Sequence, residues 1–170
     1  MPTIFPHLVA MPLGEASPGD LVRTTTFSGT SLAFVACEEG RDARHLVMLS
    51  GDGGNQPEPP YAILNVDQEE QILSYGQNYR IDLDTSEEHI HVGYVRQAEI
   101  RGAIGIRGAE RLLRVGPQLT GRPRTFWYDM EGGIFRSLQN TNICYVTAWT
   151  LGLEVPWGAP PMLLARFVAA

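Results

Sequence analysis

The sequence contains no lysine, and all 13 of its basic side chains are arginine. This absence excludes several kinds of site at once. A phosphate-binding P-loop, a pyridoxal Schiff base and the ATP site of a protein kinase each need a lysine. A genome that favours arginine codons also produces such a composition, so the missing residue narrows the chemistry without indicating a function.

Cysteine is scarce as well, with Cys37 and Cys144 as the only two. Two cysteines are too few for the disulfide framework of a small secreted protein. Both lie in apolar runs typical of strands, where a free thiol packs as a small hydrophobic side chain. We expect two buried, unpaired thiols.

Long apolar segments are also missing, since no run reaches the roughly 18 apolar residues that a membrane helix needs. Met1–Leu13 is apolar, but it has no arginine and is interrupted by three prolines, which makes it a poor signal peptide. We therefore expect a cytoplasmic or particle-associated protein with no membrane partner.

The net charge of −6 argues against a nucleic-acid partner, because phosphate backbones attract basic proteins. The charge is uneven: residues 1–95 hold fourteen acids and four arginines, whereas residues 96–124 hold seven arginines and two acids. Guanidinium groups suit carboxylates and phosphates. We expect these arginines either to pair with acids of the first half or to form an anion-binding or subunit-contact surface, at Arg101, Arg107, Arg111 and Arg114.

Short β-type runs separated by Gly, Pro, Asp and Asn dominate the chain, which predicts an all-β barrel or two-sheet sandwich of about ten strands. The clearest is Tyr79–Asp84, where apolar and charged residues alternate as on a half-buried strand. The other expected strands are 20–27, 31–37, 45–50, 61–66, 89–95, 99–107, 124–130, 134–138 and 142–155.

One short helix is predicted at Gln68–Tyr75, because Asp67 can cap it, Glu70 follows three residues later and Gly76 ends the run. The segment 162–170 fits a helix or a final buried strand. Residues 50–60 and 116–123 are expected loops. Residues 1–19 are predicted to be an extended N-terminal arm, too interrupted by proline to form a strand, and residues 20–170 a single β-rich domain.

Glu87, His89 and His91 form the best metal candidate. Residues two apart on a strand share a face, and two histidines with a carboxylate are a common set of zinc or iron ligands. We expect Ile90, Val92 and Tyr94 to face the core. The pattern is similar to the His-x-His strand of the cupin family, but it lacks the glutamate and the later histidine of that family, so the chain is not assigned to it.

Aromatic residues gather late in the chain, and Trp127 and Trp157 are the rings expected at the surface, where they could anchor a partner. No nucleophile elbow or dinucleotide motif occurs. Two hypotheses follow. The first is a non-enzymatic binding or assembly protein that forms homo-oligomers, held partly by its arm and without a cofactor, for example as a structural subunit of a larger particle. Its partner is then a second copy or another protein. The alternative is a small β-barrel metal-dependent enzyme or ligand-binding protein that uses a divalent metal on Glu87, His89 and His91.

Overall fold

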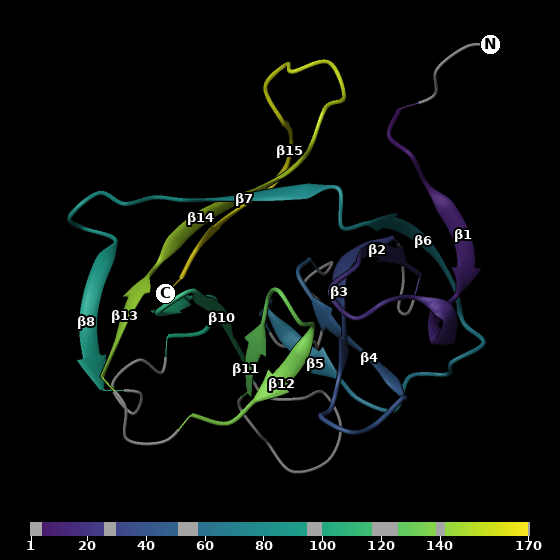
Figure 1. Cartoon of the computed structure of the whole chain (residues 1–170), viewed down its shortest axis with the longest axis horizontal. Coiled ribbons are helices and arrows are strands. Elements are labelled where there is room, and N and C mark those ends of the chain that lie inside the picture. Colours follow the sequence, from purple (N-terminus) through teal and green to yellow (C-terminus); the bar gives the residue numbers. More distant parts are fainter. Residues whose placement is uncertain are drawn as a thin grey trace.

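The computed structural model describes residues 5–25, 30–50, 58–94, 100–116, 126–138 and 142–169, and in these ranges it consists of strands and one short 3-10 turn (Figure 1). The strands form two sheets. The all-β prediction is confirmed, and of its two forms the two-sheet arrangement is right rather than one closed barrel. Fifteen strands are described, more than the number expected.

The larger sheet has the order β1-β6-β2-β3-β12-β11-β10-β9-β13-β8, with β4 pairing β3 and β5 pairing β4. Its strands are β1 (Val9–Pro12), β2 (Leu21–Thr24), β3 (Ser31–Cys37), β4 (Arg44–Met48), β5 (Tyr61–Ile63), β6 (Gln71–Gly76), β8 (Ile90–Tyr94), β9 (Ile104–Arg107), β10 (Glu110–Val115), β11 (Phe126–Asp129), β12 (Ile134–Arg136) and β13 (Asn142–Val146). The smaller sheet has the order β15-β14-β7, from β7 (Tyr79–Leu83), β14 (Ala148–Leu153) and β15 (Met162–Val168).

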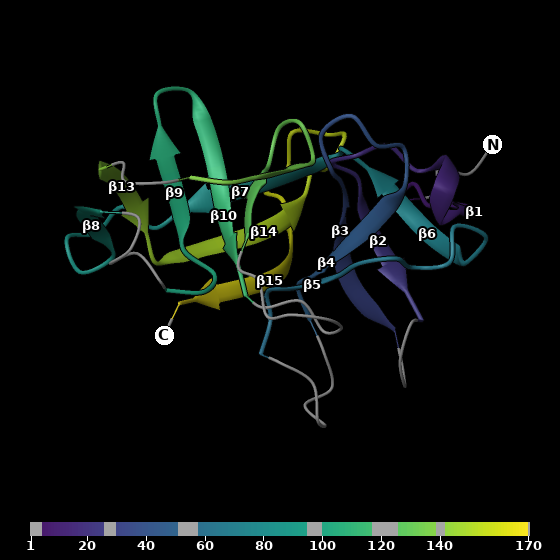
Figure 2. The ribbon, with the colours of Figure 1, turned by 90° about the horizontal axis from the view of Figure 1, so that it is seen from below.

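The strand β3 is buried on both faces, which explains its nearly unbroken apolar sequence. Phe34 faces the main core, which lies between the larger sheet and the smaller one and also contains Tyr128 and Trp149. Val35 faces a second core, around which β2 to β6 and the 3-10 turn Leu13–Glu15 curl. Figures 1 and 2 show this curled part at the N-terminal end of the molecule.

Two pairs of strands pass directly from one sheet to the other. The chain runs from β7 in the smaller sheet to β8 in the larger one, and from β13 in the larger sheet to β14 in the smaller one. At the crossing, the Asp84 N–H donates to the Ala148 carbonyl and the Thr147 N–H donates to the His89 carbonyl, each at 2.9 Å. The two sheets are therefore hydrogen-bonded into one body.

The predicted alternation of Tyr79–Asp84 is confirmed. Tyr79, Ile81 and Leu83 pack against the main core, while Arg80 and Asp82 form an exposed ion pair of 2.7 Å. The two cysteines are free: Cys37 is buried and Cys144 is partly buried. The loops expected at 50–60 and 116–123 lie largely outside the described residues, as does the start of the N-terminal arm.

The predicted helix Gln68–Tyr75 is wrong, because most of it belongs to β6. The Asp67 carboxylate accepts the Glu69 N–H at 3.0 Å, as a capping residue does, but only a turn follows. From there Ile72 and Ser74 point inward while Leu73 is exposed, which is the period of a strand. Between β1 and β2, strand pairing outweighs the local helix signals.

The prediction of an N-terminal arm too proline-rich to form a strand is also wrong for the described part of that segment. Val9–Pro12 pairs antiparallel with β6 at the edge of the larger sheet. Pro12 is tolerated there because an edge strand leaves one row of backbone groups unpaired. Leu13 then fills the second core. Of the helix and the strand that residues 162–170 could form, the structure shows the strand, β15.

Candidate functional site

The residues predicted to bind metal are not assembled into a metal site. Glu87 lies in an exposed turn, His89 ends that turn, and His91 lies on β8 with its ring 5.2 Å from that of Tyr145. Within the described ranges no three His, Cys, Asp or Glu side chains are placed to hold an ion.

The faces of β8 are the reverse of those predicted. Val92 is 77% exposed and Ile90 is also exposed, whereas His91 is partly buried against the aromatic side chain opposite it. Tyr94 belongs to β8, but its side chain lies outside the described part. The alternation of the strand was read correctly, but the identity of the covered face depends on the neighbouring strand β13, which the local sequence does not show.

His89 occupies the crossing between the sheets. Its Nδ1 lies 3.2 Å from the Thr147 hydroxyl, and its Nε2 faces the carboxylates of Glu88 at 3.6 Å and Asp84 at 3.9 Å. Hydrogen bonds from the backbone and hydroxyl of Ser86 lower the pKa of Asp84, with smaller contributions from His89 and Arg166. These contacts connect the two strands that cross between the sheets.

The four arginines proposed as an anion or interface surface have separate environments. Arg101 donates to the Glu58 carbonyl at 2.7 Å. Arg107 pairs with Glu110 at 2.7 Å, and Arg111 donates to the carbonyls of Gly108 and Glu110. Arg114 is buried, with its guanidinium 5.2 Å from the centre of the Trp127 ring. The ion pair of Arg107 with Glu110 lies within one hairpin and is formed with a local acid, not with an acid of the first half.

The two tryptophans predicted at the surface differ in their exposure. The placement of Trp127 at the surface is wrong, because β11 is covered on both faces: Trp127 packs in a third core with Ile143 and Tyr145, while Tyr128 fills the main core. Trp157 is 66% exposed and lies edge-on to Phe5, with ring centres 6.0 Å apart.

Sequence reasoning missed the most apolar exposed edge, which is β15. This seven-residue strand ends the smaller sheet and carries three exposed apolar side chains, with Leu163 at 65%, Val168 at 60% and Met162 beside them. Phe167 stacks on Trp149 at 4.0 Å and holds the strand to the core. The apolar run is visible in the sequence, but its position at a sheet edge is a property of the fold.

The other groups with shifted pKa values are interior ones with structural roles. Burial raises the pKa of Tyr79 and of Tyr128, whose hydroxyls donate to the carbonyls of Gly19 and Val35. Burial also raises the pKa of Asp20, although its carboxylate accepts the Ser17 N–H at 3.0 Å. Each of these side chains fixes a turn or a strand.

Comparison of the chain with protein-family models, with curated proteins and with solved structures gives no match. Across the described ranges, the structure has no helix with the length and apolarity required to cross a membrane.

Proposed function

We propose that the chain is a non-enzymatic assembly protein that forms homo-oligomers by pairing its β15 edge with that of a second copy. The observation that carries this proposal is the combination in β15 of length, apolar character and an outer edge that pairs with no strand of the described ranges. An edge strand presents a row of backbone donors and acceptors, and natural proteins protect such edges with charges, prolines, β-bulges or covering segments. The seven residues of β15 include one charge, one bulged residue and no proline.

The strand is suited to a copy of itself. An antiparallel pair of β15 strands places the exposed apolar side chains of one copy beside those of the other. Apolar contacts between neighbouring strands stabilise a sheet. A twofold axis of this kind is the commonest symmetry of soluble oligomers.

β15 carries a single charge, that of Arg166. Asp84 of the same chain lies near it, and the arginine is the smallest of the causes that lower the pKa of this carboxyl. The extra residue in β15, at the register shift opposite Leu151 and Gly152, is Leu164, which packs toward the main core. The exposed apolar side chains lie on both sides of it.

The test is the mass in solution of a double variant, Leu163→Lys with Val168→Lys. Both side chains are mostly exposed, so the fold is expected to tolerate the change, while two added charges on the edge oppose pairing. The wild type should have twice the 18.8 kDa mass of the chain, and the variant that mass itself.

The matched control is Val92→Lys, which places the same charge on the exposed valine of β8 and should leave the dimer intact. A monomeric wild type would refute homo-oligomerisation. A dimeric double variant would show that the interface lies elsewhere.

A further inference from the structure

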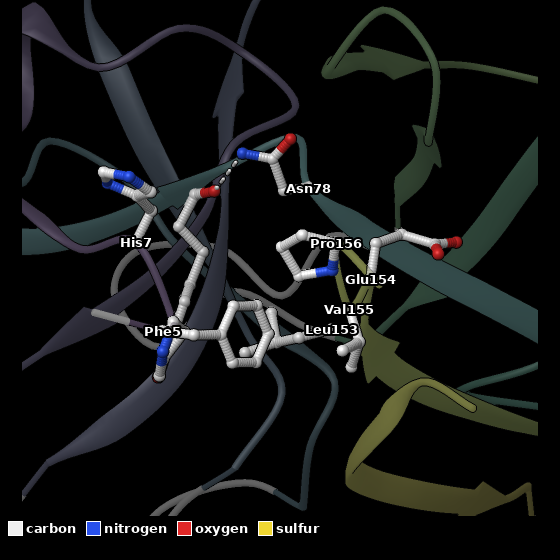
Figure 3. Close-up of a pocket in the computed structure, with 9 residues that line it drawn as sticks. Phe5, His7, Asn78, Leu153, Glu154, Val155 and Pro156 are labelled. Atoms are coloured by element: carbon white, nitrogen blue, oxygen red, sulfur yellow. Dashed lines mark hydrogen bonds between the residues drawn. The ribbon is translucent and has the colours of Figure 1, made fainter. Parts of the chain in front are cut away.

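A cavity of about 270 Å³ lies between the N-terminal segment, the turn that joins β6 to β7 and the end of β14 (Figure 3). Its lining residues are Phe5, Pro6, His7, Tyr75, Asn78, Leu153, Glu154, Val155 and Pro156. In Figure 3, Phe5 and His7 lie on one side of the space and Val155 and Pro156 on the other.

The cavity has an apolar interior and a polar rim. Leu153 and Tyr75 are buried and belong to the main core. The Tyr75 hydroxyl accepts the Arg23 Nε–H at 2.7 Å, so its polar end is already bonded. His7, Asn78 and Glu154 are exposed at the opening.

Hydrogen bonds fix the wall of the cavity. The Asn78 side-chain amide donates to the Tyr75 carbonyl at 3.3 Å, and the Glu154 N–H donates to the Asn78 carbonyl at 3.1 Å. The ring of Phe5 makes a T-shaped contact with the ring of Trp157, with centres 6.0 Å apart. The cavity is thus formed by three separate parts of the chain, two of which are hydrogen-bonded to each other.

We propose that this cavity binds a neutral aromatic group of about the size of an indole. A dry cavity of roughly 150 Å³ is enough for benzene, so the larger space found here accommodates a fused or substituted ring. The rings of Phe5 and Tyr75 offer it stacked or edge contacts, and Pro6 and Pro156 offer flat apolar surfaces.

The surroundings favour a neutral group over a charged one. A cation entering the cavity would meet the apolar floor at Leu153, while the Glu154 carboxylate is directed away from the space in Figure 3. An anion would meet the same floor without a buried donor set. Because an unpaired charge is costly to bury, the ring that fits here is uncharged.

Two sources can present such a ring: a free aromatic compound, or a tryptophan or phenylalanine side chain of a protein. The first experiment is a calorimetric titration of the full chain with indole. Saturable binding is expected, and benzyl alcohol should bind several-fold more tightly than cyclohexylmethanol, because the saturated ring forgoes the aromatic contacts.

The blocking variant is Val155→Phe, which adds a ring to the wall from a partly exposed position, and its matched control is Val92→Phe on β8. The blocked protein should bind indole at least about tenfold more weakly, and the control as the wild type does. Phe5→Ala is a second variant that removes a wall instead of filling the space, and it should also weaken binding.

A capped Ala-Ala-Trp-Ala-Ala peptide distinguishes the sources. Tighter binding than that of indole assigns the site to a protein side chain, and weaker binding assigns it to a free aromatic compound. Absence of saturable indole binding to the wild type, or wild-type affinity in Val155→Phe, would overturn the proposal. The oligomeric state does not enter this experiment, so its outcome is independent of the pairing of β15.

Discussion

His45 on β4 is a buried histidine with only one ring nitrogen bonded within the described part of the chain. Its Nδ1 accepts the Asn65 N–H at 3.2 Å, whereas Nε2 has no partner there. Burial lowers the pKa of this imidazole, with Glu38 and Arg41 acting in opposite directions. Its neutral form therefore belongs to the folded state, and a protonated ring opposes folding.

The folded state binds this proton less readily than the unfolded chain does. Stability linked to His45 is therefore fully present above the unfolded pKa of about 6.5 and is lost as the pH falls below it. The urea midpoint should fall more between pH 8 and pH 5.5 in the wild type than in His45→Gln. Parallel curves for the two proteins would contradict this prediction.

Gly133 and Gly108 are a matched pair of left-handed glycines. A Cβ at Gly133 (φ +65°) would overlap the backbone of Gly19 and Pro18, whereas a Cβ at Gly108 (φ +58°) would meet nothing within 4 Å. Gly108→Ala should cost about 1–2 kcal/mol, the penalty of the conformation alone. Gly133→Ala should cost well above that or prevent folding. Equal losses in denaturant titrations would show that the turn adapts.

At the level of single residues, the sequence predicted which side chains of a strand share a face better than it predicted which face is buried. The periods of Tyr79–Asp84 and of β8 were correct. The burial of Trp127 was not, because whether one or both faces of a strand are covered depends on segments distant in the chain. The apolar side chains of β15 are evident in the sequence, but their exposure follows from the place of that strand at an edge.

Among the elements, β1 shows how a proline-rich segment can still be structural. It pairs with β6 from Val9 to Pro12, and the 3-10 turn that follows places Leu13 in the second core. The sequence indicated an apolar N-terminal arm, but it could not specify the segment on which this arm packs. The same pairing explains why the residues predicted as a helix form a strand.

Leu13→Ala tests the role of this element. Leu13 is fully buried, so the truncation should lower the free energy of unfolding by about 2–5 kcal/mol, as for other buried leucines. Leu8→Ala, five residues earlier at an exposed position, is the control and should change stability only slightly. A wild-type midpoint for Leu13→Ala in urea would contradict the docking of this segment.

For the whole molecule, the crossing strands predict one cooperative unit. Because β7–β8 and β13–β14 each belong to both sheets, neither sheet can lose its strands without disturbing the other. The strand β1 is connected to the same unit, because its partner β6 leads directly into β7.

The proposed dimer should be insensitive to salt. Its interface is mostly apolar, with Arg166 as the one charge in each β15, so raising the ionic strength to 1 M, where the screening length is about 3 Å, should leave the dimer intact. The expected result is an unchanged dissociation constant in sedimentation measurements at low and high salt. Dissociation by salt would point instead to an interface built from the arginines of residues 96–124.

The pairing of β12 with β3 bears on how long the chain takes to fold. These strands are parallel, and beside them Tyr128 donates to the Val35 carbonyl 93 positions earlier in the chain. Closing so long a loop costs entropy before any contact repays it, so folds rich in such pairings reach the native state in milliseconds to seconds rather than microseconds. During that interval the β15 edge has no core to anchor it. Refolding at high protein concentration should therefore lose material to aggregation, and the Leu163→Lys and Val168→Lys substitutions should raise the yield.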